Sequence, residues 1–245
     1  MIILKIIVCE NYEEMSKQAA KIVSSQLIVK PNSILGLATG STPIGLYKNL
    51  IEMNQKGEID FSQVKTFNLD EYYPIKKSND QSYDYFMNEQ LFSKVNIDKN
   101  NVNIPNGEAD DPVAECQRYE NELSKIGGVD LQVLGIGQNG HIAFNEPDQN
   151  LNAVTHLTDL TQNTIEANSR FFESADDVPK KALTMGMGSI LKAKKIIILA
   201  NGANKARAVS ELLNDNINTS NPATMLKVHS DVTLICDKDA YSLVK

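Results

Sequence analysis

Three side chains that could take part in proton transfer, Asn139, His141 and Glu146, lie within an eight-residue stretch of the chain. They follow an apolar run that predicts a strand and a turn at 135–140 that contains three glycines. Glycine tolerates positive φ, so such a turn can bend the backbone and aim side chains at a ligand. Asn139 or Glu146 could hold one ring nitrogen of His141 and leave the other for proton transfer. This loop therefore favours general acid–base chemistry.

The same turn formally matches GxGxxG, the pattern of dinucleotide-binding proteins. That pattern requires a helix that opens from its third glycine, but Pro147 and the polar run 148–152 leave no room for one. It is also expected near the first strand of the fold rather than the fourth. A Ser-His-Asp hydrolase would need a GxSxG turn, and a metal site would need a second histidine at ligand spacing. The sequence has neither, so we expect no metal site here.

A second loop could bind an anion, most naturally a phosphate. Between an apolar run at 34–38 and a predicted helix lie three hydroxyl residues and a glycine: Thr39, Gly40, Ser41 and Thr42. Thr42 can cap the helix, and Pro43 suits its first position, where a missing N–H costs nothing. The free N–H groups of the helix N-terminus and the loop hydroxyls would then form an anion site. A capped helix with an empty N-terminus is the alternative, because no Walker-A lysine follows the glycine.

Other charged side chains lie where they could complete a site. Asp70 and Glu71 follow the predicted strand 64–68, and ligands of open α/β sheets bind at the carboxyl ends of strands. A solvated acidic turn before a proline is the alternative interpretation. Lys205 lies in the first turn of a predicted helix, where the dipole disfavours a cation, so a negative group should lie beside it. Arg170 could be surface charge or a clamp for an oxyanion, and sequence alone favours surface charge.

Short β-branched runs alternate with stretches of helical periodicity, which is typical of βα units and a parallel sheet. Strands are predicted at 2–9, 34–38, 64–68, 129–135, 195–200 and 231–236. Helices are predicted at 12–26, 43–50, 83–92, 111–126, 164–172, 180–191 and from 204. We therefore expect an α/β fold of Rossmann-like type, with an open, doubly wound, mainly parallel sheet and helices on both faces.

The 245 residues contain no obvious linker, so we expect a single domain over 1–245, with the segment 148–175 as a candidate mobile lid. Gly186 and Gly188 lower the helix propensity of 180–191, which suggests close packing against a loop or a ligand.

Composition excludes several classes of protein. The net charge is −7 and no lysine cluster is longer than two, which argues against a nucleic-acid surface. No apolar run approaches the roughly 20 residues that span a bilayer. The three cysteines are far apart and form no CxxC, so neither a disulfide framework nor a zinc site is indicated. We expect a cytoplasmic protein that acts on a small phosphorylated molecule, with no nucleic-acid or membrane partner.

The sequence resembles the glucosamine-6-phosphate deaminase family over nearly its whole length. The motifs, in the order and spacing of the family, are LATGSTP at 37–43, TFNLDEY at 66–72, GQNGHIAFNEP at 137–147, NSRFF at 168–172, VPKKALTMG at 178–186 and the turn at Lys205. Sugar-phosphate isomerase and lactonase relatives share the fold and the first glycine loop. The continuation HIAFNEP is specific to the deaminase.

The resemblance implies conversion of glucosamine 6-phosphate and water to fructose 6-phosphate and ammonia, without a metal or an organic cofactor. Asp70 would move the C2 proton towards C1 through an enolamine. His141 would assist opening of the pyranose ring, and Asn139 and Glu146 would complete the group around it. The residues implied to bind the substrate and its phosphate are Thr39, Gly40, Ser41, Thr42, Gly137, Arg170 and Lys205.

Two departures from the family pattern have consequences. Many members have Asp where this chain has Asn139, and because an amide cannot ionise we expect it to orient His141 by hydrogen bonding rather than by charge. Regulated hexameric members bind N-acetylglucosamine 6-phosphate at a subunit interface through basic side chains, where this chain has His156 and Thr158, and the chain ends early at Lys245. We therefore expect a monomer without this allosteric site.

Two other functions remain open. A 6-phosphogluconolactonase or sugar-phosphate isomerase relative would use the same phosphate loop without releasing ammonia. A sugar-phosphate-binding sensor would need a fused helix-turn-helix segment, for which the sequence has no spare length.

Overall fold

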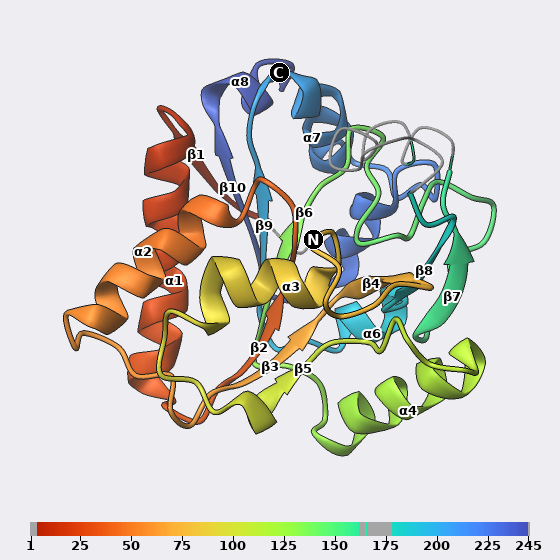
Figure 1. The fold of residues 1–245 in the computed structure, drawn as a ribbon. Helices are drawn as coiled ribbons and strands as arrows, with labels where there is room; N and C mark the ends of the chain where they lie inside the picture. Colours follow the sequence, from red (N-terminus) through yellow and green to blue (C-terminus); the bar gives the residue numbers. More distant parts are fainter. Residues whose placement is uncertain (1–3, 162–164, 166–177, 245) are drawn as a thin grey trace.

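The computed structural model describes residues 4–161, 165 and 178–244, and Figure 1 shows a central sheet with helices on both sides. Within these residues the main sheet has seven parallel strands in the order β1-β10-β9-β6-β2-β3-β5. Their bounds are β1 Lys5–Cys9, β2 Ile34–Leu37, β3 Lys65–Asn68, β5 Val102–Asn103, β6 Leu131–Gly135, β9 Ile196–Ala200 and β10 Val232–Asp237. The predicted open, mainly parallel α/β sheet is confirmed.

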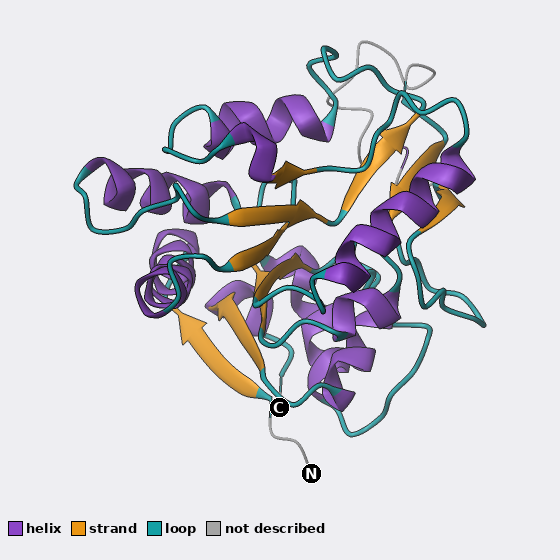
Figure 2. Cartoon of the chain, turned by 90° about the horizontal axis from the view of Figure 1, so that it is seen from below, coloured by secondary structure: helices purple, strands orange, loops and turns teal. Residues whose placement is uncertain are grey.

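Two layers of helices cover this sheet, as Figure 2 shows from a second direction. One face packs on α1 Tyr12–Val29, α2 Ile44–Gln55, α3 Tyr83–Met87 and the π-helix η1 Asn88–Phe92. The other packs on α4 Pro112–Lys125, α6 Met187–Leu191, α7 Ala206–Leu213, the 3-10 helix η5 Pro222–Val228 and α8 Lys238–Tyr241. Two further 3-10 turns are η2 Lys99–Asn101 and η4 Ala203–Lys205. Because both faces are covered, the central strand β9 is apolar throughout: Ile196, Ile197, Ile198 and Leu199 are all buried.

Local signals set the ends of the long helices. The Asn11 side chain accepts the Glu14 N–H at 3.0 Å and caps α1. Asp111 caps α4 in the same way, and Gly127, at φ 70°, follows its end. The helices predicted at 12–26 and 111–126 are therefore confirmed.

A second sheet was not predicted from the sequence. It is antiparallel, in the order β4-β8-β7, and its strands are β4 Asp70–Tyr73, β8 Lys181–Thr184 and β7 His156–Asp159. The single helix predicted at 180–191 is therefore wrong, because β8 precedes α6. The strand is held by pairing with β4 and β7, which are distant in sequence, and local periodicity does not record such pairing.

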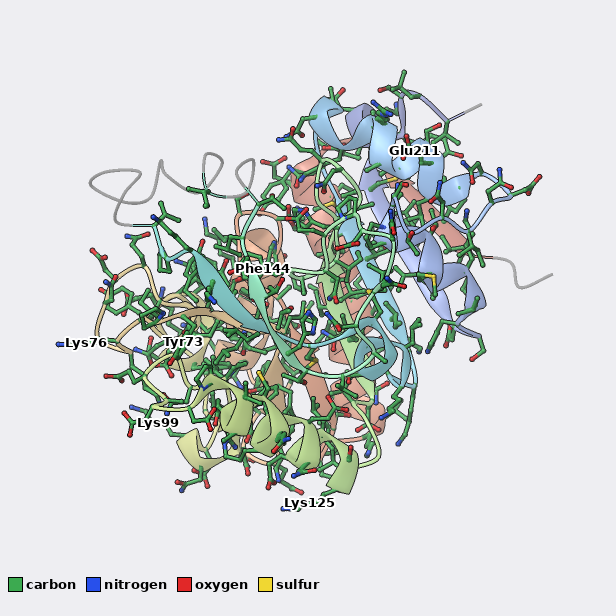
Figure 3. The ribbon with its side chains drawn as sticks, turned by 90° about the vertical axis from the view of Figure 1, so that its right-hand side faces the viewer. Tyr73, Lys76, Lys99, Lys125, Phe144 and Glu211 are labelled. Atoms are coloured by element: carbon green, nitrogen blue, oxygen red, sulfur yellow. The ribbon has the colours of Figure 1, made fainter. Side chains whose placement is uncertain are left out.

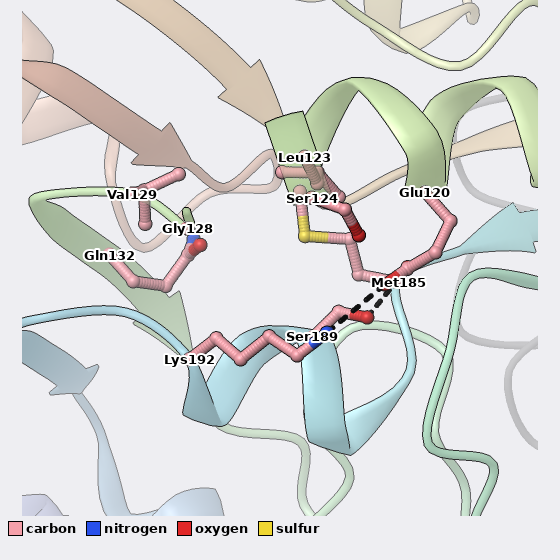
Figure 4. A pocket seen from close by; sticks show the side chains of 9 residues that line it. All are labelled: Glu120, Leu123, Ser124, Gly128, Val129, Gln132, Met185, Ser189 and Lys192. Atoms are coloured by element: carbon pink, nitrogen blue, oxygen red, sulfur yellow. Dashed lines mark hydrogen bonds and ion pairs between the residues drawn. The ribbon is translucent and has the colours of Figure 1, made fainter. Parts of the chain in front are cut away.

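The close packing predicted for Gly186 and Gly188 is confirmed. A Cβ on Gly186 would lie 2.3 Å from the Val154 carbonyl oxygen, and one on Gly188 would lie 2.8 Å from that of Ala153. The Glu120 carboxylate of α4 accepts the Ser189 hydroxyl of α6 at 2.6 Å beside a cavity of about 10 Å³ (Figure 4). The segment after the central loop is thus anchored between α4 and α6.

The helix predicted at 164–172 lies, apart from Ile165, outside the described residues, and so does most of 162–175 within the candidate lid. In the part of the chain that is described, no helix combines the length and the apolar composition needed to cross a membrane.

The chain reverses its direction across the main sheet between β2 and β6. From β2 it continues to β3 and β5, whereas from β6 it continues to β9 and β10 on the opposite side. Loops that follow two such strands diverge and leave a crevice at their carboxyl ends, which is where ligands bind in open α/β sheets. The two loops singled out in the sequence, 38–43 and 135–147, leave the sheet at this point.

Candidate active site

The side chains of His141 and Glu146 face each other within the central loop. Nδ1 of His141 lies 3.4 Å from Oε1 of Glu146, an ion-pair distance without the alignment of a hydrogen bond. Nδ2 of Asn139 donates to Oε2 of Glu146 at 2.7 Å, and Oδ1 of Asn139 accepts the His141 backbone N–H at 3.2 Å. Asn139 therefore holds the carboxylate and the loop backbone, and Glu146 is the group that faces the imidazole ring.

Two glycines allow the loop to close on itself. A Cβ on Gly137 would lie 2.3 Å from Nδ1 of His141, because the ring covers this residue. Gly140 has φ 83°, and a Cβ there would lie 2.1 Å from Oδ1 of Asn221. The Gly137 N–H donates to the His141 carbonyl at 2.9 Å, which completes the turn. The glycine-rich sequence is thus required by positive φ at one position and by close contact at both.

The second half of the loop is attached to the small sheet. The Phe144 N–H donates to the Thr184 hydroxyl at 3.2 Å, and Nδ2 of the buried Asn145 donates to the Met185 carbonyl at 2.8 Å. Thr184 pairs with Asp70 in the antiparallel register of β8 and β4. The loop that carries His141 and the strand that carries Asp70 are therefore joined through one residue. Figure 3 views this side of the molecule, where Phe144 and Tyr73 are labelled.

Asp70 is the first residue of β4, where the chain leaves the main sheet for the small one. Its side chain is buried, with 6% exposure. Burial, and secondly the charge of the adjacent Glu71, raise the pKa of Asp70 to about 8. This carboxyl therefore changes its protonation state near neutral pH, as a general acid–base group must. The alternative of a solvated acidic turn is excluded by this burial.

The phosphate loop is built differently from the prediction. Helix α2 begins at Ile44, with Pro43 at the N-cap position and no side-chain cap, so the prediction that Thr42 caps the helix is wrong. The Thr42 hydroxyl instead donates to Oδ1 of Asn201 at 3.0 Å. Asn201 follows β9, a strand that lies two positions away across β6. The Gly45 N–H, which a cap at Thr42 would have bonded, is taken by the Tyr12 hydroxyl.

Two tyrosines fix the backbone of the phosphate loop. The Tyr12 hydroxyl donates to the Ser41 carbonyl at 3.1 Å and accepts the Gly45 N–H of α2 at 2.8 Å. The Tyr47 hydroxyl donates to the Ala38 carbonyl at 2.5 Å. These bonds occupy the Ser41 and Ala38 carbonyl oxygens, which would otherwise repel an anion. The Gly45 N–H of α2 is already bonded to Tyr12. Sequence reasoning missed both tyrosines, since neither belongs to a motif that signals this contact.

Lys205 lies on the neighbouring loop after β9. The 3-10 turn η4 ends at Lys205, and the residue precedes α7. Both carboxylate oxygens of Asp237 accept the Gly202 N–H, at 3.0 and 2.9 Å, and hold this loop against the end of β10. The bond between Thr42 and Asn201 draws the same loop towards the phosphate loop. Asp237 was also missed, because an aspartate at a strand end carries no specific signal.

The structure thus brings together most of the predicted site at one end of the sheet. Arg170 lies outside the described residues. Among those that are described, no group of three His, Cys, Asp or Glu side chains is arranged as metal ligands would be.

Comparison with known proteins gives concordant matches over almost the whole chain. Residues 10–235 match the model of a family described as glucosamine-6-phosphate isomerases/6-phosphogluconolactonase. A glucosamine-6-phosphate deaminase of Thermoanaerobacter sp. (strain X514) is 58% identical over 241 residues, which are 98% of this chain and 95% of that protein.

Solved structures agree with these matches. A structure described as a monomeric glucosamine-6-phosphate deaminase has a TM-score of 0.96 at 45% identity and covers 98% of this chain and 100% of its own. The 6-phosphogluconolactonase from Trypanosoma cruzi has a TM-score of 0.79 at 20% identity, with 100% of this chain and 98% of that chain covered. The second likeness is one of fold alone.

Proposed function

Because this chain belongs to the family of glucosamine-6-phosphate isomerases and 6-phosphogluconolactonases, we propose that it converts glucosamine 6-phosphate and water to fructose 6-phosphate and ammonia. The observation that carries this proposal is the 58% identity to a protein named glucosamine-6-phosphate deaminase, against 20% to a lactonase of the same fold. The buried Asp70 and the linked pair of His141 and Glu146 supply the two acid–base groups that the reaction needs.

Ring opening is assigned to His141. With Glu146 beside Nδ1, that nitrogen carries the proton and Nε2 is left to accept one. Nε2 takes the proton of the C1 hydroxyl and returns it to the ring oxygen as the bond between C1 and that oxygen breaks. The product is the open-chain aldehyde, whose C2 proton is now acidic.

Proton transfer between C2 and C1 is assigned to Asp70. The carboxylate removes the C2 proton, the electron pair forms the C1–C2 double bond of an enolamine, and the C1 carbonyl oxygen takes the proton that the ammonium group on C2 gives up. Asp70 then delivers its proton to C1, the nitrogen becomes an iminium at C2, and water releases ammonia to leave the ketone. A pKa raised to about 8 makes Asp70 a stronger base than an exposed carboxylate, so it is suited to a carbon acid.

The phosphate is assigned to Thr39, Gly40, Ser41 and Thr42, with Lys205 as a cation. The bond from Thr42 to Asn201, which brings the loops of the two groups together, supports this assignment. Gly137 and Arg170 remain proposed substrate contacts on the family motif alone.

We further propose a monomer that N-acetylglucosamine 6-phosphate does not activate. The structural neighbour described as monomeric supports the first part. Burial lowers the pKa of His156, and its Nδ1 lies 2.9 Å from the Val154 carbonyl, so this side chain is uncharged at neutral pH and is a poor phosphate ligand. A sigmoidal substrate curve that this sugar phosphate makes hyperbolic would contradict the proposal.

The direct test is ammonia release from glucosamine 6-phosphate by the wild type beside Asp70→Asn. We expect turnover by the wild type and its loss in the variant, with sugar-phosphate binding retained. Hydrolysis of 6-phosphogluconolactone, measured in parallel, covers the alternative function. Lactone hydrolysis without ammonia release would overturn the assignment.

A further inference from the structure

Glu71 is a buried carboxylate that the mechanism above leaves unused. Its side chain is 1% exposed. Oε1 accepts the backbone N–H groups of Tyr72 and Tyr83, each at 2.9 Å, and Oε2 accepts that of Asp84 at 2.9 Å. All three partners are donors, so the geometry is that of an ionised carboxylate.

These bonds connect the strand of Asp70 to the start of α3. Tyr83 and Asp84 are the first two residues of this helix, and the Ser82 hydroxyl accepts the Tyr85 N–H at 3.0 Å. Glu71 thus completes the cap of a helix from a different element. The position of Tyr83 is fixed by the same contact.

Tyr83 in turn contacts the central loop. Its ring is stacked on that of Phe144, with centroids 6.2 Å apart and planes at 4°. The Tyr72 ring lies 4.8 Å from Tyr83 and 5.8 Å from Phe144. Phe144 lies between His141 and Glu146 in sequence, so this aromatic group links the start of α3 to the loop that carries both.

We propose that Glu71 is a positioning residue: its charge makes the neighbouring Asp70 a stronger proton acceptor, and its cap of α3 holds Tyr83 against Phe144 and so sets the loop of His141. The part that concerns turnover rests on the proposed function. The effect of the Glu71 charge on the proton affinity of Asp70 is a property of the folded protein alone and does not depend on which reaction it catalyses.

The charges around Asp70 and Glu71 favour the electrostatic effect of Glu71 on the proton affinity of Asp70. The ionisable groups that act electrostatically on one or both carboxyls are Tyr72 from β4, Tyr83 and Asp84 from α3, and Tyr119 from α4, and none of them is a cation. Burial raises the pKa of Glu71 to about 7, against the three backbone bonds that lower it, while Asp70 reaches about 8. Because three backbone N–H groups donate to its carboxylate, Glu71 is charged when Asp70 loses its proton.

The experiment compares Glu71→Gln with Glu71→Asp in the full chain. Glutamine keeps the size and one acceptor oxygen but removes the charge, whereas aspartate keeps the charge and withdraws it from α3. The titration of Asp70 is followed by NMR of ¹³C-carboxyl-labelled aspartate, with its signal assigned by its loss in Asp70→Asn. In parallel, kcat/KM for ammonia release is measured against pH.

We expect Glu71→Gln to lower the midpoint of Asp70 by about one pH unit, with the acidic limb of kcat/KM moving equally. Glu71→Asp should keep both midpoints near those of the wild type but lower kcat roughly tenfold, because α3 and Phe144 shift. The control Asp130→Asn, which removes a buried carboxylate at the opposite end of β6, should leave the pH profile unchanged.

An Asp70 midpoint in Glu71→Gln equal to that of the wild type would overturn the electrostatic role. Full turnover in Glu71→Asp would overturn the role of the cap. If the wild type released no ammonia, the proposed function would fail, and the NMR titration would still decide whether Glu71 sets the proton affinity of Asp70.

Discussion

The amide of Asn139 donates a 2.7 Å hydrogen bond to the Glu146 carboxylate, and that carboxylate lies 3.4 Å from the ring of His141. The amide therefore acts on the imidazole ring through a third residue, although its oxygen also accepts the His141 backbone N–H. Because it is a neutral donor, it stabilises the charged form of Glu146 without adding a second negative charge. Family members with Asp at this position would present a carboxylate to Glu146 instead.

Replacement of Asn139 by alanine removes this donor. Hydrogen bonds to charged groups are worth about 1.5–3 kcal/mol, so if the bond is needed in the transition state kcat should fall roughly tenfold to a hundredfold. KM should change little, since Asn139 is not assigned to the phosphate. Ammonia release under saturating substrate measures this, with the exposed Asn152→Ala as the control. Wild-type kcat in Asn139→Ala would show that Glu146 needs no support.

The contact between Gly137 and the His141 ring leads to a second prediction. A methyl group at Gly137 would lie 2.3 Å from the ring, so Gly137→Ala must displace it. A displacement of about 1 Å in a catalytic group can reduce turnover roughly a hundredfold, and we expect a loss of this order in kcat for ammonia release.

A matched control lies two residues earlier. Gly135 ends β6, and a Cβ there would meet no atom within 4 Å. Gly135→Ala should therefore retain kcat within about twofold of the wild type. If kcat fell equally in Gly135→Ala and Gly137→Ala, the loss would come from a general intolerance of the loop to alanine and not from displacement of the His141 ring.

Six of the seven strands of the main sheet could be predicted from sequence because each is a short run rich in β-branched and other apolar residues, whereas β5 has only two residues and was missed. The small sheet could not. Asp70–Tyr73 is polar and aromatic, and Lys181–Thr184 is separated from α6 only by Met185 and Gly186, so neither segment has the alternation of a typical strand. Their pairing joins residues more than a hundred positions apart, and it is this pairing that places Asp70 beside the central loop.

The candidate site shows the same division. The glycines of the central loop are visible in sequence because they recur within a few residues. Tyr12 and Asp237 were not predicted, since each acts through tertiary hydrogen bonds: Tyr12 with Ser41 and Gly45, and Asp237 with Gly202. The cap assigned to Thr42 failed for the same reason, because its hydroxyl donates to Asn201 and the Gly45 N–H bonds to Tyr12 instead.

Tyr12→Phe tests whether the missed tyrosine matters for phosphate binding. The change removes one hydroxyl that bridges the Ser41 carbonyl and the Gly45 N–H. Net loss of such bonds costs about 1 kcal/mol each, so we expect KM for the sugar phosphate to rise roughly fivefold to thirtyfold, with kcat nearly unchanged. Inhibition by inorganic phosphate should weaken in parallel.

The control for this variant is Tyr241→Phe on α8, where no hydroxyl contact to either loop is present among the described residues. A fall in kcat at constant KM in Tyr12→Phe would contradict the assignment of this loop to phosphate.

The raised pKa of Asp70 predicts how stability depends on pH. The carboxyl has a pKa of about 8 in the folded protein and 3.8 as its ordinary value. A carboxyl whose pKa is raised by folding contributes stability that is complete when the pH is below its ordinary pKa. This contribution is lost as the pH rises towards the pKa in the folded protein. Asp70→Asn should therefore match the wild type near pH 4 and be more stable by on the order of a few kcal/mol near pH 8, measured by urea unfolding.

Asp130 provides a control of opposite sign. Although burial alone would raise its pKa, hydrogen bonds from Lys194 and Lys30 lower it below the ordinary value. Its contribution is therefore present at neutral pH and is lost as pH falls, so Asp130→Asn should be less stable than the wild type near pH 7 and approach it in acid. If Asp70→Asn behaved in the same way as Asp130→Asn, the Asp70 carboxyl would be charged in the folded protein at neutral pH, and its proposed strength as a base would be lost.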